Sequence, residues 1–135
     1  MRHIATKWAL AAFLVACPIQ AMSQGSVEEF YKGKQIRLIA STEVGGLYDI
    51  YARLLAPVLA EHIPGAPRVV VQNMPGAGGI KMVDYIYSAA PRDGTVIGAT
   101  HSSIPTAPLT TPYDANFDVN KIAWLGSITS DPYIG

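Results

Sequence analysis

The 135-residue chain has little charge and almost no cysteine. Its 10 basic and 10 acidic residues cancel, and together they make up only 15% of the chain. Proteins that bind nucleic acid through its phosphates need a basic surface, so this composition argues against DNA or RNA as a partner. Hydrophobic residues make up 50% of the chain, which excludes an intrinsically disordered protein and indicates a domain with a core.

The N-terminal segment has the pattern of a secretory signal peptide. A positively charged start precedes an apolar run over residues 8–17, and residues 21–23 provide a small-x-small cleavage site. The run is about half the ~20 residues that a membrane-spanning helix needs. Residues 1–23 are therefore predicted to be a signal peptide, and the mature chain is predicted to be exported.

The single cysteine, Cys17, lies at the end of this apolar run. Residues 14–17 also resemble a lipoprotein box, in which Cys17 would become the lipidated first residue. Pro18 follows the cysteine directly and favours cleavage near residues 21–23 instead, so lipidation is the less favoured alternative. Without Cys17 the mature chain has no disulfide, and its fold depends on an ordinary core.

The rest of the chain alternates between strand and helix patterns. Three short runs rich in β-branched and apolar residues indicate strands, and two runs with apolar residues three and four apart indicate helices. The strands are expected at 35–40, 69–71 and 95–99, and the helices at 47–59 and 80–87. The order predicts an α/β fold with a βαβαβ parallel sheet, in which strand 69–71 is buried on both faces.

The last third of the chain is less regular. The helical period is lost between Thr100 and Asp118, where three prolines interrupt a polar stretch. Residues 121–128 are apolar enough to predict one more strand.

Three loops are expected at the carboxyl edge of this sheet, where ligands bind in open α/β folds. They cover residues 41–48, 73–80 and 101–106, and the first two are rich in glycine. Free amides and the positive end of a helix can hold a carboxylate or phosphate without a basic side chain. The alternative is that the glycines only permit tight turns and close packing.

Sites for cofactors and metals are not indicated. Lys81 stands where a dinucleotide-binding loop would need its third glycine, and no phosphate-binding Gly-Lys-Ser/Thr occurs. No spacing of histidine and acidic residues resembles a metal site. The sequence therefore predicts neither a cofactor nor a metal.

Catalysis has one weak candidate. His101 stands next to Ser102 and Ser103, but neighbouring side chains on an extended segment point in opposite directions. A small exported Ser/His hydrolase is therefore kept only as an alternative, and the chain is predicted not to be an enzyme. Asp49 and Arg53 lie four apart on the first helix and are expected to form an ion pair, with Asp49 organising the loop before it.

Several motifs together resemble the solute-binding proteins of the tripartite tricarboxylate transporters, also called the Bug family. The most specific are Asn-Met-Pro-Gly-Ala-Gly at 73–78 and Pro-Arg-Asp-Gly-Thr at 91–95. The further segments that carry the resemblance are 30–34, 44–49, 52–55, 62–65, 69–72 and 124–127. One departure is Val44, where many relatives have proline.

The resemblance implies a type II periplasmic-binding-protein-like fold, with two lobes that close on a small carboxylate. The solute would be a di- or tricarboxylate or a related organic acid, passed by a monomeric periplasmic receptor to the membrane permease subunits. The family holds such ligands mainly through loop amides. Carried over, the ligand-binding residues are Thr42, Val44, Gly45, Gly46, Leu47, Asp49, Ala77, Gly78, Ser102 and Ser103.

Length is the larger departure, because family members are roughly twice this size, as two domains require. Residues 24–120 are expected to form the first α/β lobe, and 121–135 a strand that crosses toward a second lobe missing from this chain. Some apolar surface and one sheet edge should then be uncovered. This leaves a third hypothesis, an orphan lobe that docks on a partner through that edge.

Overall fold

A computed structural model describes residues 24–110 and 116–128 of the chain. The predicted signal peptide, with Cys17 and the lipoprotein box, lies outside the described residues. The helices are α1 (Gln24–Tyr31), α2 (Leu47–His62), α3 (Ile80–Ser88) and α4 (Ala107–Thr110), and the strands are β1 (Gln35–Ala40), β2 (Arg68–Asn73) and β3 (Val96–Ala99). Single 3-10 turns lie at Ala77–Gly79, Ile104–Thr106 and Val119–Lys121.

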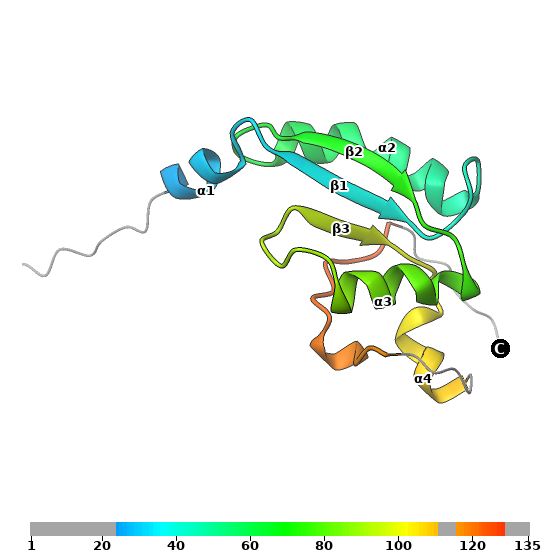
Figure 1. Ribbon diagram of the computed structural model, residues 1–135. Helices are drawn as coiled ribbons and strands as arrows, with labels where there is room; N and C mark the ends of the chain where they lie inside the picture. The colour runs from blue at the N-terminus through cyan, green and yellow to red at the C-terminus, as the bar shows by residue number, and fades with distance from the viewer. Residues whose placement is uncertain (1–23, 111–115, 129–135) are drawn as a thin grey trace, which may run out of the picture.

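The three strands form one parallel sheet in the order β2-β1-β3. Gln35 of β1 pairs with Arg68 of β2, and Arg37 pairs with Val96 of β3. Helices α2 and α3 form the crossovers between successive strands, and all three arrows in Figure 1 point the same way. The predicted α/β fold with a βαβαβ sheet is confirmed, and its arrangement is like one lobe of a periplasmic binding protein.

The two crossover helices cover opposite faces of the sheet, because alternate residues of β1 belong to different clusters. Leu38 and Ala40 pack on one side against Ala52 and Ala56 of α2. Ile39 points to the other side, where the cluster is completed by Ile80, Met82, Val83, Ile104 and Phe117. Figure 1 shows α2 and α3 on either side of the strands. The core is therefore divided into two layers by β1, whose Ile36, Leu38 and Ile39 are at most 1% exposed.

A glycine in β3 allows α3 to lie close to the sheet. A Cβ atom at Gly98 would lie 2.6 Å from Cδ1 of Ile86 and 3.0 Å from Sδ of Met82. Both side chains belong to α3, so a larger residue at this position would force them to repack.

The expectation that strand 69–71 is buried on both faces is wrong. β2 stands at the edge of the sheet, and Val69, Val70 and Val71 are each only partly buried. The central, fully covered position belongs to β1 instead. A run of β-branched residues indicates a strand, but it does not say which neighbours that strand will have.

The C-terminal segment differs from the sequence-based prediction in two places. The stretch from Thr100 to Asp118, expected to be loop, contains the short helix α4 and the turn Ile104–Thr106 before it. The strand expected at 121–128 is absent: this segment is irregular after the turn Val119–Lys121, and the sheet of the described residues consists of β2, β1 and β3. Apolar residues alone do not make a strand, because a strand also needs hydrogen bonds to a neighbouring strand. Trp124 of this segment donates from Nε1 to the carbonyl of Val119.

Apolar side chains remain exposed on the outer side of α2. Leu47, Ile50, Leu54 and Val58 follow a helical spacing and are 47% to 66% exposed. We call this set the α2 stripe. Among the described residues, no helix combines the length and the apolar character required to cross a membrane.

Candidate functional site

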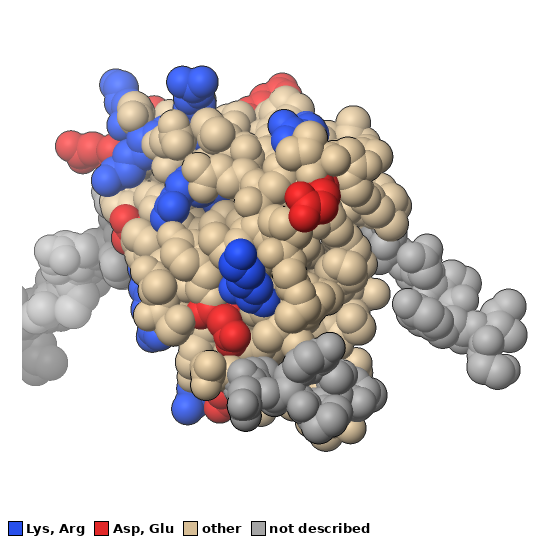
Figure 2. All heavy atoms as spheres, turned by 45° about the vertical axis from the view of Figure 1, so that its right-hand side comes forward, with Lys and Arg blue, Asp and Glu red and all other residues tan. Residues whose placement is uncertain are grey.

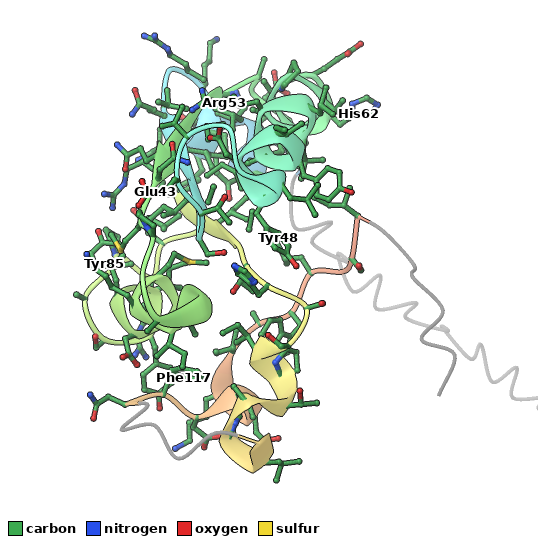
Figure 3. All side chains as sticks on the ribbon, turned by 90° about the vertical axis from the view of Figure 1, so that its right-hand side faces the viewer. Glu43, Tyr48, Arg53, His62, Tyr85 and Phe117 are labelled. Carbon is green, nitrogen blue, oxygen red and sulfur yellow. The ribbon has the colours of Figure 1, made fainter. Side chains whose placement is uncertain are left out.

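The carboxyl ends of all three strands lie at one edge of the sheet, and the loops that follow them meet there. Figure 3 looks onto this edge, with Glu43 and Tyr48 labelled on the first loop and the start of α2. Loop 1 covers residues 41–46, loop 2 covers 74–79 and loop 3 covers 100–103. Loops 1 and 2 lead into the N-termini of α2 and α3, where backbone amides point outward. The edge therefore has the general form of an anion-binding site.

Loop 1 is held in place by the carboxylate of Asp49, which is buried in the first turn of α2. Oδ2 accepts from the amide of Gly45 at 2.8 Å, and Oδ1 accepts from Nδ2 of Asn73 at 2.9 Å. Arg53 adds Nε to Oδ2 at 3.0 Å and Nη2 to Oδ1 at 2.9 Å. The ion pair expected between Asp49 and Arg53 is confirmed, and Asn73 is a partner that the sequence did not indicate.

These contacts stabilise the ionised form of Asp49. The hydrogen bond from Arg53, followed by those from the Gly45 amide and Asn73, lowers the pKa of Asp49 from 3.8 to about 2. The same bond raises the pKa of Arg53 above its ordinary value. Loop 1 thus already encloses one negative charge, and the cation nearest to it is committed to that charge.

Several predicted ligand contacts in loop 1 are bonded within the protein. The amide of Gly45 donates to Asp49, and the amide of Gly46 donates to the carbonyl of Glu43 at 3.0 Å. Thr42 accepts from the amide of Asp49 through Oγ1 at 3.1 Å. The amides best placed for a ligand are those of Leu47 and Tyr48, because first-turn amides have no acceptor within the helix. Exposed apolar side chains flank them, with Val44 75% and Leu47 56% exposed.

Loop 2 turns sharply before α3. Gly76, Ala77, Gly78 and Gly79 all have positive φ, at 142°, 48°, 61° and 96°. Ala77 carries the strain of this run, because a residue with a Cβ rarely adopts such a φ. Both predicted contacts in this loop, Ala77 and Gly78, are exposed to solvent.

Loop 3 contacts loop 2 and the first turn of α2 through His101 and Ser102. The ring of His101 lies against that of Tyr48, with 4.5 Å between their centroids. The amide of Ser102 donates to the hydroxyl of Tyr48 at 3.2 Å. A Cβ at Gly79 would lie 3.2 Å from Cδ2 of His101, which joins loop 3 to loop 2. The structure therefore brings together residues that are distant in sequence at one edge.

The proposed nucleophile pair is not formed in the described part of the chain. Ser102 and Ser103 are exposed, and neither shares a hydrogen bond with His101. The imidazole is stacked on Tyr48 instead. Nor does any group of three or more His, Cys, Asp or Glu residues within the described ranges have an arrangement that could hold a metal ion.

Two hydroxyls at this edge were not singled out from the sequence. Ser41 directly follows β1 and Thr100 directly follows β3, and both hydroxyl oxygens are buried without a hydrogen-bond partner. Their position as the first polar residue after a strand was the available signal. Figure 2 shows a face of the molecule on which charged side chains are scattered among uncharged ones.

Three proteins of known sequence are similar to this chain. A UPF0065 protein of Cupriavidus necator is 33% identical over 123 residues, which is 90% of this chain and 37% of that protein. A UPF0065 protein of Bordetella bronchiseptica is 31% identical over 117 residues, covering 84% of this chain and 33% of the relative. The protein BugT of Bordetella pertussis is 31% identical over 119 residues, again 84% and 33%.

The chain spans about a third of the length of these curated relatives. No family model matches it. No solved structure matches it either.

Proposed function

Because these matches confirm the predicted homology to UPF0065/Bug proteins, we propose that this chain is a solute-binding lobe that takes part in capturing a small carboxylate. The chain carries out no reaction of its own. The solute is a di- or tricarboxylate or a related organic acid, and the receptor passes it to the permease subunits of a tripartite tricarboxylate transporter.

The observation that carries the proposal is the convergence of two helix N-termini at one edge of the sheet. The amides of Leu47 and Tyr48 begin α2, and exposed Ala77 and Gly78 precede α3. Such amides, helped by the helix dipole, favour an anion. The nearby cation, Arg53, is paired with Asp49 and reinforces loop 1.

The remaining parts of the proposal rest on the resemblance and on the N-terminal pattern. Residues 1–23 direct export to the periplasm, and residues 24–120 form the first lobe of a monomeric two-lobed receptor. Residues 121–135 lead toward the second lobe. A single lobe offers one wall of the ligand site, so its affinity is expected to be far below that of a closed receptor.

A test of the carboxylate site uses a position where the amide can be removed without breaking the helix. Leu47 is the first residue of α2, where proline is tolerated, and the preceding Gly46 has the extended conformation that a following proline needs. Leu47→Pro removes one amide donor, whereas Leu47→Ala keeps it and removes only the side chain.

We expect acetate, succinate or citrate to shift amide resonances of loops 1 and 2 in an NMR titration, while neutral acetamide does not. Loss of a hydrogen bond to a charged group should weaken binding about tenfold in Leu47→Pro and leave Leu47→Ala nearly unchanged. If none of the acids shifts these resonances, or if acetamide shifts them equally, the carboxylate site is refuted.

The hydrolase and orphan-lobe alternatives have separate tests. His101→Ala abolishes activity on a panel of esters only if this residue is a catalytic base. Sedimentation at increasing concentration reports association through an open sheet edge. If the chain is a receptor lobe, we expect no esterase activity in the original protein or in His101→Ala.

A further inference from the structure

The hydroxyls of Ser41 and Thr100 have no role in the fold as described. Ser41 is 3% exposed, and neither its Oγ nor Oγ1 of Thr100 has a hydrogen-bond partner. A buried hydroxyl without a partner costs free energy, because it has given up its bonds to water. Two such groups beside each other in the sheet indicate a partner that the protein itself does not supply.

Their position in the topology is specific. Ser41 follows β1 and Thr100 follows β3, and these adjacent strands remain joined by the amide of Ser41 donating to the carbonyl of Ala99 at 3.0 Å. β2 lies on one side of β1 and β3 on the other, so the chain changes the direction in which it adds strands at β1. The crossover helices α2 and α3 cover opposite faces of the sheet. Ligands of open α/β sheets bind outside the carboxyl ends of the strands at such a reversal.

The same point lies at the N-terminus of α3. Gly79 is the N-cap of this nine-residue helix and supplies no side-chain cap. A Cβ built on Gly79 would lie 3.2 Å from Oγ1 of Thr100 and 3.3 Å from Cβ of Ser41. Both hydroxyls are therefore adjacent to a helix end whose amide dipoles favour a negative charge.

We propose that Ser41 and Thr100 donate hydrogen bonds to a second carboxylate of the solute, bound at the N-terminus of α3. This inference rests on the proposed function, in which the first carboxylate binds the amides of Leu47 and Tyr48. The ring of His101 lies beside Gly79 and against Tyr48. It turns aside when the second carboxylate enters.

A chain of side-chain contacts links the two subsites. Tyr48 belongs to the first turn of α2, its ring contacts His101, and His101 borders Gly79 at the start of α3. A solute that occupies both subsites needs one hydrogen-bond acceptor group for the α2 amides and another for the two hydroxyls. A solute with a single carboxylate uses only one of the two helix ends.

The experiment compares succinate with butyrate, which has the same number of carbons but one carboxylate. NMR titrations of the 135-residue chain and of the double variant Ser41→Ala/Thr100→Val give the affinity for each acid. We expect the chain to bind succinate at least about tenfold more tightly than butyrate, and the double variant to lose this preference. Ser88→Ala, at the far end of α3, is the matched control and should keep it.

Thermal unfolding of the same variants separates binding from a structural role. Replacing an unpartnered buried hydroxyl by an apolar group of similar shape is neutral or stabilising, so Tm should not fall in the double variant. A lower Tm with unchanged binding would mean that the hydroxyls only hold a buried water, and this overturns the inference. Equal affinity for the two acids, or a succinate preference that survives in the double variant, also overturns it but leaves a carboxylate site intact. Absence of binding by both acids overturns the proposed function as well.

Discussion

The side chains of Asp49 and Arg53 meet as a two-point pair, with Oδ1 2.9 Å from Nη2 and Oδ2 3.0 Å from Nε. The side chain of Asp49 is nearly inaccessible, at 2% exposure, whereas the side chain of Arg53 is 50% exposed. Two parallel bonds fix the orientation of the carboxylate, which then accepts from Gly45 and Asn73. One side chain of α2 thus connects loop 1 to the end of β2.

Replacing Asp49 with asparagine should destabilise the protein. An amide group in this position turns one acceptor oxygen into a donor, which then faces donors from Gly45, Asn73 or Arg53. We expect Tm to fall by at least about 5 °C in thermal unfolding followed by circular dichroism. Arg53→Lys keeps the positive charge but cannot form two parallel bonds to the carboxylate, so its Tm should lie between those of the original protein and Asp49→Asn. An unchanged Tm in Asp49→Asn would contradict the role given to this carboxylate.

Acid should remove the stabilisation that the ionised carboxylate of Asp49 provides. The pKa of Asp49 is lowered to about 2 in the folded state from 3.8, so the unfolded chain takes up a proton first. The stabilisation is therefore fully present above the unfolded pKa and is lost as pH falls toward about 2. Urea unfolding at decreasing pH should show a steeper loss of stability in the original protein than in Asp49→Asn. Parallel pH curves for the two proteins would argue against this.

A glycine pair tests the packing of α1. Gly65 and Gly33 both have positive φ, at 87° and 72°, so alanine is strained at either position. Only at Gly65 would the added Cβ meet backbone, overlapping the carbonyl oxygen of Glu28 and lying 2.8 Å from the amide of Lys32. Gly65→Ala should therefore lower the free energy of unfolding by about 1 to 3 kcal/mol more than Gly33→Ala. Equal losses would show that α1 moves aside without cost.

Two faces of α2 should respond differently to substitution. Leu54 belongs to the α2 stripe and is 66% exposed, so Leu54→Lys should change stability by no more than about 0.5 kcal/mol. Ala52 is fully buried against the sheet, and Ala52→Leu should cost about 1 to 3 kcal/mol through overpacking. Chemical denaturation measures both. A large loss in Leu54→Lys would show that something covers the stripe.

Local features were predicted well, and long-range ones were not. Strand 35–40 and the helix that begins at Leu47 follow from residue type and spacing, which act within a few residues. The bond from Asn73 to Asp49 joins positions 24 apart, and only the pairing of β1 with β2 brings them together. The absent strand at 121–128 has the same cause, because an apolar pattern does not determine whether a segment pairs with an edge strand of the sheet.

Site residues divide in the same way. Glycine-rich loops after strands were expected at one edge of the sheet, and the structure brings them together there, since parallel strands end together. The sequence did not indicate that the amides of Gly45 and Gly46 are bonded within loop 1, or that the hydroxyls of Ser41 and Thr100 are buried. Both facts depend on which atoms face each other after folding, and spacing alone cannot provide them.

The central position of β1 also determines the order in which this lobe can be assembled. β1 leaves the ribosome before β2 and β3, yet its pairing with β3 joins Arg37 to Val96, which is synthesised much later. A nascent chain with only β1 and β2 has a two-stranded ribbon whose central strand lacks one set of hydrogen bonds. Such non-local pairing slows folding and leaves an open edge for longer, so the chain stays extended and vulnerable to mispairing until residues 96–99 arrive.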